Sequence, residues 1–194
     1  MRILSLGASA VAISLLVASS PALPRRDPLL ASAAGNGAVH RVSATYDGIL
    51  PDATQTPGAT NPSITQANIA QNICNPHWTT RSIRPPSSYT SALKRRQLAA
   101  GYAVNGDVQA ADYEEDHLIS LELGGNPTDA RNLWPEPWHV DTPNGDRGAY
   151  RKDHVENATH DAVCAGRMTL LDAQHSIATD WVALGRRLGL PEFQ

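Results

Sequence analysis

The sequence predicts an α+β fold that is mostly helical, with a small β-hairpin packed on a helix and one disulfide. Three observations predict this class. Helical patterns fill the last third of the chain, two short strand patterns flank a Gly-Gly turn near the middle, and the chain has two cysteines. With 41% hydrophobic residues, the chain has enough apolar side chains for a core. We therefore expect one folded domain and a monomer.

The first 22 residues have the pattern of an export signal. Arg2 gives a positive start, residues 3–18 are apolar and uncharged, and Ser20-Pro21-Ala22 offers the small residues that signal peptidases cleave after. The alternative is an uncleaved membrane anchor, but the apolar run is shorter than the roughly 20 residues that span a bilayer. We expect a secreted or periplasmic protein whose mature form does not bind a membrane.

The segment after this signal is predicted to be a linker. Residues 23–48 are rich in Ala, Gly, Pro and Ser and show little periodicity. A single domain is expected over residues 49–190. The formal net charge of −3 argues against tight nonspecific binding to DNA, although it leaves room for a local basic groove.

Helices are predicted in four segments. Residues 64–73 form a short pattern, and residues 88–102 form a better one, since Pro85-Pro86 prevents an earlier start and Gly101 can end it. The third helix is predicted over residues 151–164, which contain no Pro or Gly. In the fourth segment, after Thr169, one helical face carries apolar residues that predict core packing: Ala173, Ile177, Trp181, Leu184 and Leu188.

Two strands are predicted around the Gly-Gly turn. Residues 113–123 read as a strand that runs into a loop at Gly124-Gly125. Residues 131–134 read as its short partner, which Pro135 and Pro137 are expected to stop. Together these segments give the small hairpin.

The two cysteines, Cys74 and Cys164, are predicted to form the disulfide. An even number of cysteines in an exported chain favours pairing. Closing so long a loop would stabilise the fold by roughly 4–5 kcal/mol in the chain-entropy treatment. Because the pair has no CxxC spacing, the sequence does not indicate a zinc or redox site there.

Chemistry is indicated most directly by Asp116-His117, followed by Gly124-Gly125 and Asn132. Hydrolysis of a phosphodiester needs a water, a base that takes its proton, and positive charge on the phosphate. Asp116 and His117 are adjacent, so a regular strand would point them to opposite faces. Both reach one site only if the strand ends or bends there. Asn132 could hold the loop or ligate a metal through its oxygen.

At these residues the chain resembles the HNH (ββα-metal) nucleases. The resemblance is carried by Asp116-His117, the loop over 121–125, Asn132-Leu133 and a following helix over about 151–164. A wider similarity, over roughly residues 50–182, is to exported bacterial proteins often labelled HNH-type, with Asp116 to Gly125 and Asn132 to Pro137 as its main motif. The resemblance implies a ββα-metal-like core, with His117 as general base, Asp116 as metal ligand and Asn132 as loop organiser or ligand.

The chain departs from that family in two ways. The last metal ligand usually follows the Asn closely, but here Pro135 to Ala149 intervene and the candidates are His160, Glu156 and His154. Glu156 and His160 are one helical turn apart, whereas His154 lies off that face, so His160 is preferred and Glu156 comes next. The cysteine pairs of the zinc-stapled subgroup are also missing, and a disulfide is expected in their place.

Other residues have two interpretations each. Lys94-Arg95-Arg96, with Arg81 and Arg84, could line a phosphate-binding groove or could form a solvated helix face. Trp134 and Trp138 are expected to pack in the core or in loops rather than to stack on bases.

The hypothesis is a secreted, metal-dependent nuclease that acts on DNA or RNA with a divalent cation, expected to be Mg²⁺. Its expected site residues are His117 and Asn132 for catalysis, Asp116, His160 and Glu156 for the metal, and Arg84, Lys94 and Arg95 for phosphates. One alternative is a non-catalytic exported binding or structural module on a degenerate HNH-like scaffold. Another is a cell-envelope interaction protein that docks through Trp138 and the loop over 135–143.

Overall fold

The structure is a computed structural model that describes residues 46–194. The predicted signal (1–22) and most of the predicted linker lie outside these residues. The main elements are, in chain order, α1 (Ser87–Gln97), β1 (Tyr113–His117), β2 (Leu133–Pro137), β3 (Asp141–Thr142), β4 (Gly145–Asp146), α2 (Ala149–Cys164) and α3 (Leu170–Arg187). The predicted class is confirmed, because helices dominate and β1 pairs with β2 in an antiparallel hairpin. Within residues 46–194, no helix combines the length and apolar character needed to cross a bilayer.

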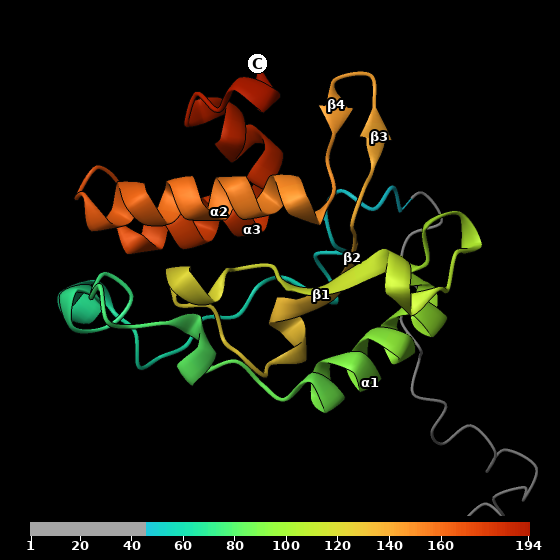
Figure 1. The fold of residues 1–194 in the computed structure, drawn as a ribbon, viewed down its shortest axis with the longest axis horizontal. Helices are drawn as coiled ribbons and strands as arrows, with labels where there is room; N and C mark the ends of the chain where they lie inside the picture. The colour runs from blue at the N-terminus through green and yellow to red at the C-terminus, as the bar shows by residue number, and fades with distance from the viewer. Residues whose placement is uncertain (1–45) are drawn as a thin grey trace, which may run out of the picture. The chain divides into compact units, whose positions relative to one another are not determined.

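The hairpin of β1 and β2 lies between two helical layers. Helix α1 lies along one side, and the antiparallel pair α2 and α3 lies along the other (Figure 1). On the α1 side, Gln97 Nε2 donates to the Leu133 carbonyl at 2.6 Å, and Lys94 Nζ donates to the Tyr113 carbonyl. The second hairpin, β3 and β4, projects beyond these layers (Figure 1).

The prediction that Pro135 stops the second strand is wrong, since β2 starts at Leu133 and continues to Pro137. The ladder places its hydrogen bonds on alternate pairs. Leu118 N donates to Asn132 O, and Trp138 N donates to Asp112 O. Pro135 and Pro137 therefore fall on the intervening pairs, whose backbone nitrogens point away from β1. A strand accepts prolines there because no ladder bond is lost.

The predicted helices appear with changed ends. Helix α1 begins at Ser87, directly after Pro86, and a π-helical turn extends it over Leu98–Tyr102. Gly101 in that turn has φ of 120°, a conformation that favours glycine, so the regular helix ends before it. The segment predicted as a helix over 64–73 is a short 3-10 helix, Gln66–Gln71.

The core forms between α2, α3 and the loop that follows β1. Thr169 caps α3, since its Oγ1 accepts a hydrogen bond from Asp172 N at 3.1 Å. The predicted apolar stripe of α3 is buried, with Ala173, Ile177 and Trp181 fully enclosed. Trp181 also donates through Nε1 to the Ile49 carbonyl at 2.7 Å. The sequence pattern therefore identified the core face of this helix correctly.

The predicted disulfide between Cys74 and Cys164 is present. It joins the last residue of α2 to the irregular segment before α1, across a sequence separation of 90 residues. The segment that it fixes continues through a 3-10 turn, Thr80–Ser82, to Arg84. The bridge thus links α2 to the segment that leads to Thr80 and Arg84, two residues that line the pocket described next.

Candidate functional site

A pocket of about 280 Å³ opens where β1 ends, between α2 and the segment around Arg84. Asp116 and His117 both line it, although they are neighbours on a strand. Four further carboxylates line the same pocket: Glu114, Glu122, Asp153 and Glu156. Two neighbouring strand residues reach one site only if the strand ends or bends there. The strand does end at His117, and both side chains line this pocket.

Asp116 is 7% exposed and is held through one oxygen. Its Oδ2 accepts hydrogen bonds from Trp134 Nε1 at 2.9 Å and from Lys152 Nζ at 2.8 Å. Trp134 stands directly opposite Asp116 in the hairpin, so the strand register itself delivers the indole donor. Within residues 46–194, Oδ1 has no hydrogen-bond partner, so it is the oxygen of Asp116 that remains for a ligand in the pocket.

His117 is also 7% exposed, and its ring is oriented by a backbone carbonyl. Nε2 lies 3.1 Å from Pro127 O. A carbonyl only accepts, so this bond places the ring proton on Nε2 and leaves Nδ1 with a lone pair. Burial lowers the pKa of His117 and outweighs the opposing effects of the Pro127 carbonyl and Asp116. The imidazole is therefore neutral at pH 7 and able to accept a proton at Nδ1.

Lys152 is the cation at the centre of the carboxylates. It is fully buried, and its Nζ contacts Asp116 Oδ2, the His117 carbonyl at 3.1 Å, and Glu156 Oε1. Burial lowers the pKa of Lys152, but Asp116, Glu156 and Glu136 raise it by more, so the net shift is upward. The ammonium stays charged and has an oxygen partner for each of its three protons.

The carboxylates around the pocket are crowded. Burial and, to a smaller extent, the nearby Asp116 together raise the pKa of Glu114 to about 7. Burial also raises the pKa of Glu122 and of Asp153. Such shifts arise where carboxylates lack enough positive charge to balance them. A divalent cation would supply that charge, and carboxylate oxygens are the donors that Mg²⁺ prefers.

Asn132 holds the loop after β1 and uses its whole side-chain amide to do so. Its Oδ1 accepts from Ile119 N at 2.9 Å and from Ala59 N at 3.3 Å. Its Nδ2 donates to Ile119 O at 3.0 Å and to Asn126 O at 3.1 Å. These contacts are those of a loop organiser rather than of a metal ligand.

Gly125 shows how tightly this loop closes. A Cβ atom at this position would lie 1.7 Å from the Ile119 carbonyl oxygen and 2.8 Å from Asn132 Nδ2. No side chain fits there without moving the backbone. The Gly-Gly and Asn132 of the sequence motif are thus parts of one structural device that turns the chain beside His117.

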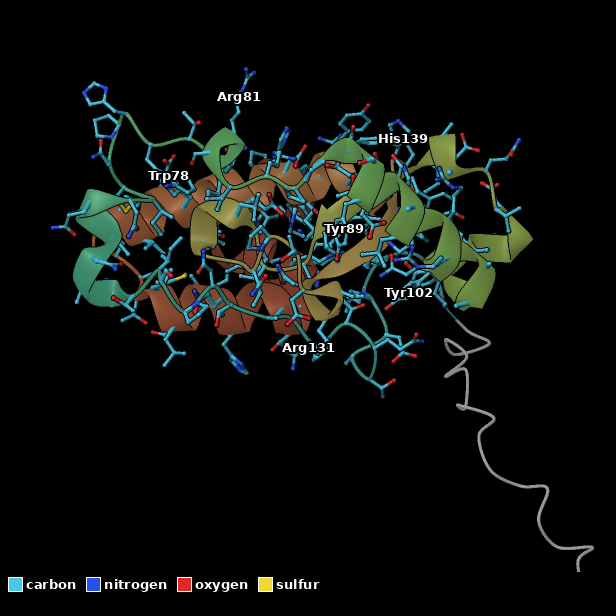
Figure 2. The ribbon with its side chains drawn as sticks, turned by 90° about the horizontal axis from the view of Figure 1, so that it is seen from below. Trp78, Arg81, Tyr89, Tyr102, Arg131 and His139 are labelled. Carbon is cyan, nitrogen blue, oxygen red and sulfur yellow. A yellow bond between two sulfur atoms is a disulfide. The ribbon has the colours of Figure 1, made fainter. Side chains whose placement is uncertain are left out.

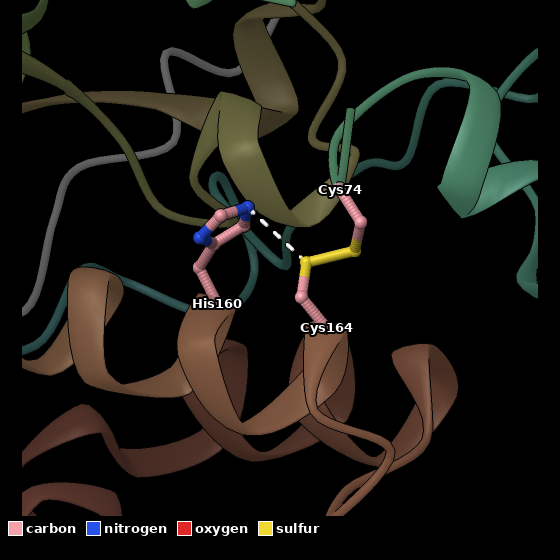
Figure 3. Close-up of side chains that lie close together, drawn as sticks. All are labelled: Cys74, His160 and Cys164. Atoms are coloured by element: carbon pink, nitrogen blue, oxygen red, sulfur yellow. Dashed lines mark hydrogen bonds between the residues drawn. A yellow bond between two sulfur atoms is a disulfide. The ribbon is translucent and has the colours of Figure 1, made fainter. Parts of the chain in front are cut away.

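His160 lies outside the pocket at Asp116. It is one turn beyond Glu156 on α2, and its Nε2 contacts Ile73 O at 2.8 Å and Cys164 Sγ at 3.4 Å (Figure 3). Within residues 46–194, His160 with Cys74 and Cys164 forms the only group of three potential ligands whose atoms all lie within 4.8 Å of one another. The two sulfurs are bonded to each other, so neither is the thiolate that binds metal.

Of the other two candidate ligands on α2, one lines the pocket and the other does not. Glu156 lines the pocket, 13% of its side chain is exposed, and one oxygen is paired with Lys152. His154 points elsewhere, since its Nδ1 lies 2.8 Å from Glu192 Oε1. Of the expected metal residues, the structure therefore brings Asp116 and Glu156 together and leaves His160 apart.

The expected phosphate-binding residues do not form one groove. Arg84 is exposed and lines the pocket. Lys94 donates to the Tyr113 carbonyl on the α1 side of the hairpin, and burial lowers its pKa. Arg95 is exposed on α1 and does not line the pocket, while Arg81 extends from the surface (Figure 2). Of these four basic residues, Arg84 is thus the one that lines the pocket with His117.

Besides Glu122 and Asp153, sequence reasoning missed Glu114, Lys152 and Glu136 around this pocket. Glu114 lines it, Lys152 is the buried cation, and Glu136 pairs in register with Glu114. Glu136 is fully buried, and burial followed by Asp116 raises its pKa far above the ordinary value. A usable signal for Lys152 was its spacing of four residues from Glu156, which predicts an ion pair on one helix face.

The fold and the pocket together define an α+β protein with a histidine and several carboxylates gathered at the end of a hairpin strand. Comparison of the chain with protein-family models, with curated proteins and with solved structures gave no match.

Proposed function

We propose that this protein hydrolyses phosphodiester bonds of nucleic acid with the help of a divalent cation. One observation carries the proposal. A neutral imidazole, with its proton held on Nε2 by Pro127 and a free lone pair on Nδ1, stands beside a carboxylate oxygen that faces the same pocket. That is the arrangement that water activation at a metal-bound phosphate requires. The motif resemblance of residues 116–133 to HNH nucleases supports the same conclusion.

Each residue then has a defined part in the reaction. His117 Nδ1 accepts a proton from the attacking water while Pro127 O keeps the ring in place. Asp116 Oδ1 and Glu114 would hold the cation, which when bound supplies positive charge on the scissile phosphate, while Glu156 is paired with Lys152. Arg84 at the rim would contact a non-bridging phosphate oxygen, as guanidinium groups commonly do.

The test is cleavage of plasmid DNA, single-stranded DNA and RNA by the protein with Mg²⁺ or Mn²⁺. His117→Ala should lower the rate at least about 100-fold, since general-base catalysis contributes 10²–10⁴-fold. His139→Ala is the matched control, because its side chain is 69% exposed and lies outside the pocket. A folded wild-type protein that cleaves none of these substrates with any divalent metal would remove the proposal.

A second candidate is a non-catalytic binding module on the same scaffold. It is favoured by the engagement of Asp116 Oδ2 and Glu156 with Lys152, which uses part of the carboxylate charge within the protein. This alternative predicts that Mg²⁺ and Mn²⁺ leave the melting temperature unchanged. A metal-dependent rise that Asp116→Asn abolishes would exclude it.

A further inference from the structure

The placement of Asp116 and His117 in one pocket must be explained by the residues around them. Neighbouring residues on a strand point to opposite faces, yet Asp116 and His117 line one pocket. The loop that Asn132 holds turns the chain after His117, but it makes no contact with the carboxylate of Asp116.

Lys152 contacts both residues through a single atom. Its Nζ lies 3.1 Å from the His117 carbonyl and 2.8 Å from Asp116 Oδ2. The first contact ties the last residue of β1 to α2. The second, with Trp134 Nε1 on the same oxygen, leaves Oδ1 as the oxygen of Asp116 without a hydrogen-bond partner among residues 46–194. We propose that Lys152 is a positioning residue, whose ammonium orients Asp116 and His117 toward one reacting centre.

Stability alone does not explain a lysine at this position. An ammonium without solvent exposure loses its hydration, and buried ion pairs are often no more stabilising than apolar side chains of similar size. An apolar residue at 152 could fill the same space between α2 and the hairpin. It could not donate to the His117 carbonyl and to Asp116, which are the two contacts that shape the pocket.

Glu156 has a separate part in this arrangement. It lies four residues from Lys152 on α2 and accepts a hydrogen bond from the same ammonium. It thereby fixes the direction of the lysine side chain, and among residues 46–194 it has no hydrogen bond to Asp116 or His117. Glu156→Gln therefore keeps the two contacts of Lys152 that matter, and it provides the reference in which their loss can be measured.

The proposal rests on the proposed hydrolysis, so its test uses two readouts, one of them independent of activity. Three variants are compared with wild type: Lys152→Met, Glu156→Gln, and the double variant, which removes one charge of each sign. Arg186→Met, at an exposed position of α3, controls for loss of a cation. The first readout is the ¹⁵N NMR signature of the His117 ring, and the second is kcat and KM with Mn²⁺.

We expect one tautomer of His117, protonated on Nε2, in wild type, Glu156→Gln and Arg186→Met. The double variant should show both tautomers, with kcat at least 100-fold below that of Glu156→Gln and KM within threefold of it. A merely structural lysine would change the melting temperature and leave the ring signature as it is.

Three outcomes would overturn the assignment. One is a double variant that folds and matches Glu156→Gln in ring signature. Another is a folded double variant with an altered ring but an unchanged kcat. The third is failure of the double variant to fold, which would make Lys152 a scaffold residue. If wild type cleaves nothing, the proposed function fails, and the NMR comparison still decides whether Lys152 positions His117.

Discussion

Removal of the disulfide between Cys74 and Cys164 should destabilise the protein strongly. The bond closes a loop with a sequence separation of 90 residues. In the chain-entropy treatment, this closure restricts the unfolded chain by about 15 cal/mol/K, which corresponds to roughly 4–5 kcal/mol at 25 °C. For a domain of this size, a loss of that magnitude lowers the melting temperature by roughly 10–15 °C.

The assay is urea unfolding of the Cys74→Ala/Cys164→Ala variant beside wild type, followed by circular dichroism. Wild type treated with a phosphine reductant serves as the control, because reduction should reproduce most of the loss without changing any side-chain volume. The transition midpoint should fall and its slope should rise, because the slope follows the surface exposed on unfolding and the unfolded chain without the cross-link is less compact.

Two results would refute this reasoning. Detection of two titratable thiols in denatured, non-reduced wild type would show that the bridge does not form. A variant that loses less than about 1 kcal/mol would show that loop entropy is not the main contribution of the bridge. The bridge also ends near the segment with Arg84, so cleavage activity of the variant reports whether that wall of the pocket needs the tether.

Three further predictions concern the loop, the core and the hairpin. Asn132→Ala should destabilise by at least about 3 kcal/mol in chemical unfolding, because buried backbone groups of Ile119 lose their partners; a loss below 1 kcal/mol would contradict the loop-organiser role. Trp181→Ala should cost about 3–5 kcal/mol in the same assay, since the side chain is fully buried, and a smaller loss would mean that α3 repacks. Burial raises the pKa of Glu115 to about 8, and its oxygens have no hydrogen-bond partner among residues 46–194, so its contribution to stability is present below pH 4.5 and is lost as the pH rises to 8. Glu115→Gln should therefore raise the melting temperature more at pH 8.5 than at pH 5.5, and an equal change at both would count against this shift.

The sequence predicted correctly the features that depend on interactions between residues close together in the chain. The apolar spacing along α3 predicted its buried face, and Pro86 and Gly101 predicted the limits of the helix that contains α1. The pairing of Cys74 with Cys164 followed from there being only two cysteines. The limits of β2 did not follow, because a proline interrupts a strand only when its nitrogen faces the partner, and that depends on the register.

The residues of the candidate site also fall into those that the sequence predicted and those that only the structure could place. Asp116, His117, Gly125 and Asn132 were found from the sequence because they lie within one short motif, where spacing limits how far apart the residues can be. The sequence ranked His160 above Glu156 as the last metal ligand, but both face one side of a helix and the neighbours of that face could not be read from the sequence. In the structure, Glu156 lines the pocket while His160 lies against the disulfide.

The sequence by itself therefore determined an α+β chain with one bridge, a buried stripe on its last long helix, and a histidine beside a carboxylate next to a glycine turn. Only the tertiary structure decided that both of those side chains reach one pocket, that Arg84 is the cation at its rim, and that Lys152 is buried among the carboxylates. The physical reason is the separation along the chain over which each kind of interaction acts. Helix periodicity and turn preferences act over a few neighbouring residues, whereas the charge and hydrogen bonds of the pocket come from segments that only packing brings together.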